Sequence, residues 1–368
     1  MIYKTLDAIE KIFERCVAQG KTKEYGGLLT YYATAQAAEA GGNKELLEKC
    51  RQYFNLYPDN IQHPNYFFEV YRPGGMGKAW MFFKGYMPES ADLLREYAEI
   101  VMQARCSKDG LLCMPHRVTK REMAWIDPVH VVSPYMLYVG LALNEEKYID
   151  YAVEKTIKAY DIFLDKECGL LHQCKGFDKR DPEIISRDHW GRGNGWGYIA
   201  LAEMACYLPD DSKHKETVVK YFIDHSDAII KQQTVYGLWR QEMMSEHSWH
   251  ESSGTAIFIY GLGKGIRHGI LKGEKYVEAF KKGVQGLINS CIVEDLTIYR
   301  CCHGCCCPGY GDMLGSMEAY SANPMPIPDD IHAFGPVILA LTEAYKAGIT
   351  ELDISNSYGY PGFAWNYD

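Results

Sequence analysis

The sequence lacks long apolar runs and clusters of positive charge. None of its apolar stretches reaches the ~18 residues that a membrane-spanning helix needs, so no membrane association is predicted. The net charge of −9 and the absence of a run rich in Lys and Arg argue against binding to nucleic acid. An anionic ligand would have to be held by a few well-placed cations, because the overall field repels it.

Features of secreted proteins are also missing. Charged residues are spread through the N-terminal segment, where a signal peptide would carry an uninterrupted apolar core. Thirteen cysteines, an odd number, indicate reduced thiols in such a chain rather than a disulfide framework. These observations predict a cytoplasmic protein.

Three signatures of common enzyme classes are absent. The chain has no Gly-rich phosphate loop, no dinucleotide-binding fingerprint and no G-x-S-x-G nucleophile elbow. Nucleotide-dependent enzymes and serine hydrolases are therefore not indicated. No linker rich in Pro, Gly or Ser divides the chain, and its composition (47% hydrophobic, 24% charged) is typical of a globular protein. We therefore predict a single domain over residues 1–368.

A short apolar sequence motif recurs along the chain. The leucines at the corresponding position of each copy are Leu111, Leu170, Leu238 and Leu296, which stand roughly 60 residues apart. A fixed period is typical of repeat architectures, and this one divides the 368 residues about six times.

Between the copies of this motif, the apolar residues mostly follow helical spacing. Two helices in each of six repeats would form an all-α (α/α)6 barrel of six helical hairpins, with nearly apolar inner helices such as those over 256–266 and 332–344. An open solenoid is the alternative, but the sequence shows no polar capping repeats. The predicted helices cover residues 4–19, 25–40, 43–55, 75–87, 89–106, 130–143, 146–165, 195–206, 212–231, 253–269, 273–290 and 333–347.

Candidates for chemistry fall where loops lead into or out of helices. Such junctions would meet at one end of the ring, where a ligand site is expected. Helix capping alone would also explain Asp127 and Glu251, and a lone histidine such as His172 is more often structural than functional. The junction residues are Trp125, Asp127, His172, Trp190, Arg192, Trp196, Glu251, Asp329, Asp330 and His332.

The segment CCHGCCCPG at residues 301–309 is unusually rich in cysteine. Thiolates and the imidazole of His303 are typical zinc ligands. Adjacent cysteines do not easily reach one tetrahedral centre, however, and no second C-x-x-C pair supplies the other half of such a site. The pattern favours a turn lined by reduced thiols near the floor of the barrel, and no metal site is predicted.

Four segments carry a resemblance to a known family. "AWIDPVHVVSPYM", "HWGRGNGWGYIAL", "HESSGTAIFIYGLGKGI" and "DDIHAFGPVILAL" resemble signature segments of the unsaturated uronyl hydrolases of glycoside hydrolase family 105, rhamnogalacturonyl type. The resemblance covers residues 120–345 and is looser over 1–110. It implies an (α/α)6 barrel. It also implies removal of a terminal 4,5-unsaturated uronic acid from pectin-derived, rhamnogalacturonan-type oligosaccharides by hydration of the C4=C5 enol ether, without a cofactor.

The resemblance implies roles for individual residues. Asp127 corresponds to the family's catalytic aspartate. Substrate-binding positions correspond to His172, Trp190, Arg192 and Trp196.

A second site carboxylate is expected in the family, as an aspartate within an early D-x-x-x-x-G segment. Here Glu69 stands at the nearest match, so a glutamate is predicted in that place. His332, at the last junction, is added as a substrate-binding candidate.

The predicted chemistry requires Asp127 to be protonated near neutral pH and then to act as a base. Its ordinary pKa of ~3.9 must therefore be raised. An apolar pocket and the like charge of Glu69 would both raise it. Arg192 would pair with the substrate carboxylate. Three glycines between residues 190 and 196 would let the segment bend, so that both tryptophans and Arg192 face the sugar.

Two other classes of function remain open. One is ordinary glycoside hydrolysis, which needs two carboxylates, or sugar epimerisation on the same barrel, for which His172 and His332 could form a histidine pair. The other is a non-catalytic protein that binds carbohydrate, or zinc through the cysteine-rich segment.

Overall fold

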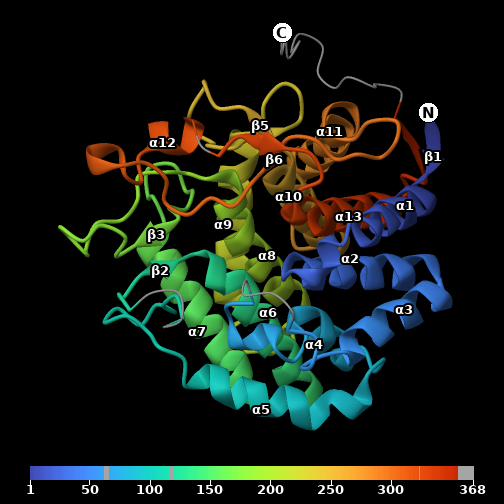
Figure 1. Cartoon of the computed structure of the whole chain (residues 1–368), viewed down its shortest axis with the longest axis horizontal. Coiled ribbons are helices and arrows are strands. Elements are labelled where there is room, and N and C mark those ends of the chain that lie inside the picture. The colour runs from blue at the N-terminus through green and yellow to red at the C-terminus, as the bar shows by residue number, and fades with distance from the viewer. Residues whose placement is uncertain (62–65, 116–119, 323, 355–368) are drawn as a thin grey trace.

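The computed structural model describes residues 1–61, 66–115, 120–322 and 324–354, and helices dominate it (Figure 1). They alternate along the chain between an inner and an outer layer. The helices are α1 (Thr5–Ala18), α2 (Gly26–Gly41), α3 (Lys44–Asn55), α4 (Gly75–Phe83), α5 (Ala91–Met102), α6 (Asp127–Leu143), α7 (Glu146–Phe163), α8 (Gly191–Tyr207), α9 (Lys215–Lys231), α10 (Ser252–Arg267), α11 (Glu274–Ser290), α12 (Met317–Ala322) and α13 (Ile331–Lys346).

Six helices form a closed inner ring. In order around it, α2, α4, α6, α8, α10 and α13 each pack against the next, and α13 packs against α2. These helices are buried on nearly all sides; α8 is buried continuously from Gly191 to Ala205. The outer helices α1, α3, α5, α7, α9 and α11 each bury one face. The predicted (α/α)6 barrel is confirmed, and the closed ring is incompatible with an open solenoid.

Short antiparallel strand pairs lie on the segments before four of the inner helices. The strand β2 (Ala124–Trp125), before α6, pairs with β3 (Cys174–Lys175), before α8, and β4 (Trp239–Arg240) pairs with β5 (His250–Glu251) before α10. The pair β6 (Cys301–Cys302) and β7 (Pro326–Ile327) lies before α13. These pairs fix the loops at one end of the ring, which is the end that carries the candidate site.

The first and last described strands also pair. β1 (Ile2–Lys4) runs antiparallel to β8 (Glu351–Asp353), with Tyr3 opposite Leu352. The N-terminal ammonium of Met1 donates to the carbonyl oxygen of Ile354 over 2.6 Å. The two ends of the ring are therefore joined by backbone hydrogen bonds as well as by the packing of α13 on α1 and α2.

Two inner helices begin earlier than predicted. Helix α6 begins at Asp127, and α8 begins at Gly191, inside the glycine-rich segment. The short helix α12 was not predicted. The expectation that the glycines bend this segment is wrong, because they lie in regular helix.

The glycines allow close packing instead. A Cβ at Gly191 would lie 2.7 Å from the carbonyl oxygen of Arg240, and a Cβ at Gly195 would lie 3.1 Å from the side chain of Ile257. Small residues at these positions therefore let the start of α8 approach β4 and α10.

A buried ion pair lies within the ring. Lys264 of α10 donates to the carboxylate of Glu203 of α8, and both side chains are fully buried. The hydroxyls of Tyr32, Tyr138 and Tyr260 also donate to this carboxylate, so α2, α6, α8 and α10 meet around one charge. A buried charge of this kind requires such partners.

None of the described helices combines the length and the apolar character needed to cross a membrane. The single domain over 1–368 stays a prediction, since residues 355–368 lie outside the described part of the chain.

Candidate functional site

A cavity of about 90 Å³ opens where the inner helices α2, α6, α8 and α13 begin. Aromatic side chains make up much of its wall, and one carboxylate and one guanidinium face it. Its lining residues are Tyr25, Phe67, Phe68, Tyr71, Met114, Trp125, Asp127, His130, Val131, Trp190, Arg192, Trp196, Gly304, Cys305, Cys306 and His332. An aromatic cavity with few polar groups is typical of a small-molecule site.

Asp127 is the first residue of α6, and it does not cap that helix. The capping position belongs to Ile126, whose side chain makes no capping hydrogen bond. The capping interpretation of Asp127 is therefore wrong. By contrast, the Glu251 carboxylate caps α10 by accepting from the backbone N–H groups of Ser253, over 2.9 Å, and Gly254, over 2.5 Å, so its structural interpretation is confirmed.

The carboxyl of Asp127 has an unusual acidity. Burial raises its pKa from 3.8 to about 7, because the charged form loses hydration in the cavity. A hydrogen bond from Gln173 and the positive charge of Arg192 act in the opposite direction but do not outweigh burial. The nearby like charge of Asp188 adds to the rise. Asp127 is therefore poised to hold or release a proton near neutral pH.

Gln173 orients this carboxyl, and sequence reasoning missed it. Its Nε2 donates to Asp127 Oδ2 over 3.4 Å and to the carbonyl oxygen of Cys305 over 2.8 Å. Its Oε1 accepts from the backbone N–H of Cys307 over 3.3 Å and from the hydroxyl of Tyr320. These partners fix which end of the amide faces Asp127. In the sequence, the one indication of its role is that Gln173 directly follows the candidate His172. Its hydrogen-bond partners at residues 305–320 are distant in the chain, and only the fold brings them near.

Arg192 is almost completely buried at the cavity wall. Its Nη1 donates to Ser253 Oγ over 3.1 Å and to the carbonyl oxygen of Cys302, and Nη2 donates to the carbonyl oxygen of His303 over 2.9 Å. Its guanidinium also lies over the ring of Trp190, at 4.7 Å from the centroid. The Nε atom is buried and has no hydrogen-bond partner among the described residues. The Nε–H of Arg192 is thus left to donate to a ligand, while backbone carbonyls of the cysteine-rich segment accept hydrogen bonds from its two other guanidinium nitrogens.

The two tryptophans of the glycine-rich segment play different parts. Trp190 lies under Arg192, whereas Trp196 stacks on His130 with ring centroids 3.9 Å apart. Both line the cavity. His130 also escaped the sequence analysis; burial lowers its pKa to about 3, so it is neutral.

His332 lines the cavity from the start of α13. Its Nδ1 lies 2.5 Å from Asp330 Oδ1, and its Nε2 lies 2.5 Å from the hydroxyl of Tyr25. Burial lowers its pKa, although Asp330 opposes this effect. His332 is therefore a neutral group that the cavity presents with a fixed orientation.

Two predicted site residues lie away from these. Glu69 lies on a short 3-10 helix (Glu69–Tyr71) and pairs with Arg72, with Oε2 and Nε 2.9 Å apart; it is not among the residues that line the cavity. His172 also does not line it, and its Nδ1 lies 2.9 Å from the carbonyl oxygen of Asp188. The proposed His172–His332 pair is therefore not formed in this cavity, and Asp127 is the one carboxylate among its described lining residues.

The cysteine-rich segment lies against the cavity. Cys305 and Cys306 line it, and all thirteen cysteines are free thiols. In the described part of the chain, residues 301–307 do not form a group of potential metal ligands; such a group lies elsewhere. The zinc-binding interpretation of this segment thus gains no support.

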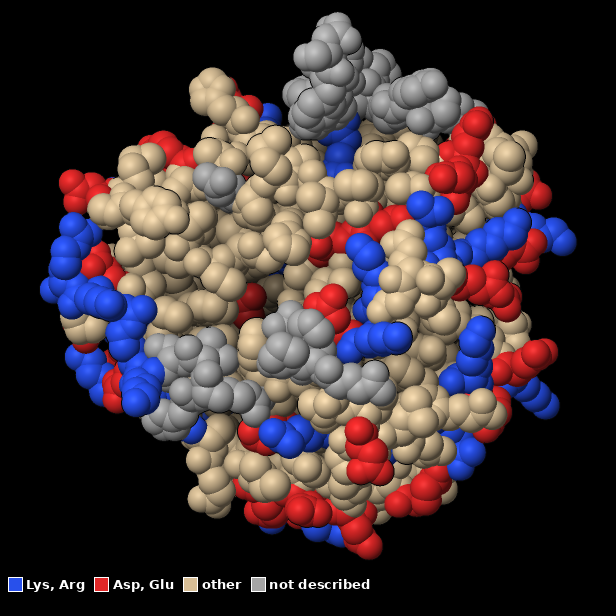
Figure 2. All heavy atoms as spheres, viewed as in Figure 1, with Lys and Arg blue, Asp and Glu red and all other residues tan. Residues whose placement is uncertain are grey.

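A wider cleft of about 530 Å³ adjoins the cavity and shares Trp125 and Cys306 with it. Arg121, Lys179 and Arg180 also line it. Figure 2 shows Lys and Arg side chains, mixed with Asp and Glu, along the left edge of the molecule, beside the loops that flank β2 and β3 in Figure 1, and others across the right-hand side.

The chain is similar to several known proteins. The sequence model of the family described as Glycosyl Hydrolase Family 88 matches residues 5–348. An unsaturated 3S-rhamnoglycuronyl hydrolase from Formosa agariphila is 29% identical over 180 residues, which are 46% of this chain and 47% of that protein. The unsaturated rhamnogalacturonyl hydrolase YesR of Bacillus subtilis is 21% identical over 305 residues, covering 81% and 84%. The chain spans less than half the length of the first two curated relatives that it matches.

Solved structures share the fold. A structure described as a possible member of the GH105 family, from Salmonella enterica serovar Paratyphi A, superimposes with a TM-score of 0.78 over 94% of each chain, at 19% identity. At this identity the likeness establishes the fold alone.

Proposed function

Because the chain belongs to glycosyl hydrolase family 88, we propose that it is a glycosidase that removes a terminal 4,5-unsaturated uronic acid by hydrating the C4=C5 bond. Its substrates would be pectin-derived oligosaccharides of the rhamnogalacturonan type. The observation that carries the proposal is a single carboxyl with a pKa of about 7, facing an aromatic cavity beside an arginine.

Asp127 serves first as an acid and then as a base. In its protonated form it donates to C4 of the enol ether, which leaves an oxocarbenium-like centre at C5. The resulting carboxylate takes a proton from water as the water oxygen bonds to C5, so Asp127 is protonated again. The hemiketal then opens without help and releases the leaving sugar. A proton donor of this kind contributes about 10²–10⁴-fold to the rate.

Gln173 supports the charged state of the Asp127 carboxyl. Its amide N–H points to Oδ2, so it stabilises the carboxylate that forms after proton transfer. Because the amide is held by backbone groups of residues 305 and 307, its orientation does not have to be reorganised during the reaction.

Arg192 binds the substrate carboxylate in this proposal. Its unpartnered Nε–H is buried at the cavity wall, where a carboxylate oxygen would satisfy it. The aromatic rings of Trp125 and Trp196 offer faces for the sugar. Of the junction residues named in the sequence analysis, the cavity brings together Trp125, Asp127, Trp190, Arg192, Trp196 and His332. We retain Asp127, Trp190, Arg192, Trp196 and His332 as site residues.

The adjoining cleft accommodates the rest of the oligosaccharide. Three cations and one carboxylate, Asp178, are among its lining residues, so the cleft favours a chain that carries further negative groups beyond the leaving sugar. Rhamnogalacturonan-type oligosaccharides carry such uronic acids. The thirteen free thiols support a location in the cytoplasm.

Ordinary hydrolysis is less well supported, since it needs two carboxylates flanking the bond. The test is to incubate the protein with unsaturated and saturated forms of the same oligosaccharides and to follow the enol absorbance together with the released sugars. We expect loss of absorbance and sugar release from the unsaturated forms alone. Release from saturated forms, or an unchanged absorbance during release, would contradict hydration.

A further inference from the structure

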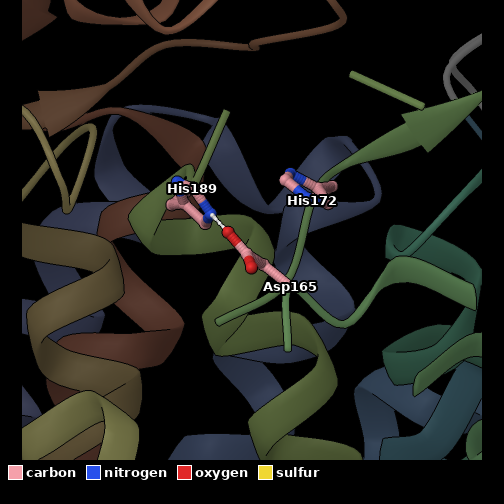
Figure 3. A group of neighbouring side chains, drawn as sticks. All are labelled: Asp165, His172 and His189. Carbon is pink, nitrogen blue, oxygen red and sulfur yellow. Dashed lines mark hydrogen bonds and ion pairs between the residues drawn. The ribbon is translucent and has the colours of Figure 1, made fainter. Parts of the chain in front are cut away.

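Three side chains with metal-binding atoms converge outside the cavity (Figure 3). Asp165 follows the end of α7, His172 lies on the return segment before β3, and His189 precedes α8. One ligand atom from each lies within 4.8 Å of the others, and Asp165 Oδ2 lies 3.0 Å from His189 Nε2. None of the three lines the cavity.

The residue types of the group suit a metal ion. Asp165 and His172 stand on one short return segment, and His189 adds a second imidazole. The partly exposed thiol of Cys168 lies nearby but does not belong to the group of mutually close ligand atoms. Carboxylate and imidazole are among the usual ligands of Zn²⁺.

The other ring nitrogens of both imidazoles face oxygen atoms. His172 Nδ1 lies 2.9 Å from the carbonyl oxygen of Asp188 and can donate to it, whereas His189 Nδ1 lies 3.5 Å from Glu242 Oε1 without forming a hydrogen bond. These positions leave Nε2 of each ring for the centre of the group. Metal-ligating histidines almost always donate their other N–H to a carbonyl or a carboxylate, as the geometry of His172 allows.

We propose that Asp165, His172 and His189 bind one zinc ion, which has a structural role because none of the three lines the cavity. The fourth position of a tetrahedral ion is left to a water molecule. A tetrahedral zinc ion holds such ligands ~3.3 Å apart, so binding draws His172 toward the Asp165–His189 pair, which already has that spacing. His172 is then a zinc ligand and not a substrate-binding residue.

The position of the site gives it a function. It ties residues 165–172 to residue 189, and the neighbours of these ligands are the positioning residue Gln173 and the cavity residue Trp190. Asp188 reinforces the same junction by accepting from the backbone N–H of Gln173 over 3.1 Å and of Trp190 over 3.0 Å. The ion therefore fixes two segments of the cavity wall to each other.

The alternative is a metal-free cluster in which a protonated His189 pairs with Asp165. To distinguish the two, the full-length protein is treated with a chelator, dialysed and titrated with Zn²⁺ in a calorimeter, and its melting temperature is measured with and without the ion. We expect one zinc per chain and a higher melting temperature in its presence, because the ion binds the folded state. Substitution with Co²⁺ should give the visible absorption of a four-coordinate site, which His189→Ala removes.

Variants locate the ion. We expect His189→Ala to weaken zinc binding at least roughly 100-fold, since even indirect partners of a metal are worth 10–100-fold. His214→Ala is the matched control: its Nε2 lies 2.6 Å from Asp150 Oδ1, a His–Asp pair outside the group, and zinc binding should not change. The proposal is wrong if the wild-type chain binds no zinc, if His189→Ala binds it as well as wild type, or if Cys305, Cys306 and Cys307→Ser abolish binding. Because binding is measured without substrate, these results are independent of the proposed reaction.

Discussion

Gln173 holds Oδ2 of Asp127 at 3.4 Å through an amide whose other hydrogen bonds all go to residues 305–320. The acid of the cavity is therefore oriented by a loop from the opposite part of the chain. Because the amide donates to the carboxylate, it lowers the pKa of Asp127, while burial raises it. Several measurable consequences follow from this balance.

Asp127→Asn should abolish most of the activity without unfolding the protein. The amide keeps the size of the carboxyl but has no proton to deliver, so we expect kcat to fall at least about 10²-fold. The melting temperature should move little, because Asp127 does not cap α6. Activity close to that of wild type would refute the role of this residue.

The activity should fall as the pH rises through about 7. The proton donor is the acid form of Asp127, and burial raises its pKa to about 7, so the fraction of competent enzyme decreases above that pH. A raised pKa also means that the folded state holds this proton more tightly than the unfolded state. Its contribution to the free energy of unfolding therefore decreases between pH ~4 and ~7. A pH profile of kcat/KM, with denaturant unfolding at the same pH values, measures both; an alkaline limb absent up to pH ~9 would contradict the assignment.

Gln173→Leu should shift that alkaline limb to higher pH. Removing the donor destabilises the carboxylate and raises the pKa of Asp127 further. A residue that merely supports the fold would lower activity equally at all pH values, so the shape of the profile separates the two roles.

Arg192→Ala should weaken the apparent affinity for the unsaturated substrate. Loss of one partner of a buried charged pair costs roughly 2–5 kcal/mol. Lysine should restore only part of this, since it cannot offer two parallel N–H donors. The diagnostic measurement is the ratio of the apparent affinities for the substrate and for its carboxyl-reduced analogue. If this ratio is the same in wild type and in Arg192→Ala, Arg192 does not bind the substrate carboxylate.

Replacing Cys305, Cys306 and Cys307 together by serine should leave activity largely intact. Gln173 uses the backbone carbonyl of Cys305 and the backbone N–H of Cys307, and serine keeps both. Activity measured alongside the melting temperature checks this, and a selective loss of activity would assign a chemical role to the thiols.

The fold was largely predictable from the sequence, because the apolar pattern that determines each helix is local and recurs along the chain. Apolar spacing identified the helices of both layers, and the family resemblance is confirmed by the match over residues 5–348. The starts of α6 and α8 were placed too late. Pro128 suggested a loop, although proline is tolerated in the first turn of a helix. Glycines at 191, 193 and 195 also suggested a loop, where close packing against β4 and α10 accommodates a helix.

The cavity was predictable only in part. Asp127, Arg192 and the tryptophans lie at helix starts, which a helix pattern reveals. Gln173 and His130 acquire their positions from contacts with distant segments, which no spacing shows. Glu69, predicted as the second site carboxylate, pairs locally with Arg72 and does not line the cavity, and Asp188 supplies a like charge near Asp127.

The closure of the ring by its first and last hairpins has a consequence for synthesis in the cell. Helix α2 packs against α13, and β1 pairs with β8. The apolar face of α2 that packs on α13 is therefore covered only after about 300 further residues have been made. At ~5–20 residues per second, that apolar face stays uncovered for some tens of seconds on the ribosome. The nascent chain should therefore depend on chaperones until its last helix emerges, and a truncation before α13 should yield aggregated rather than partly active protein.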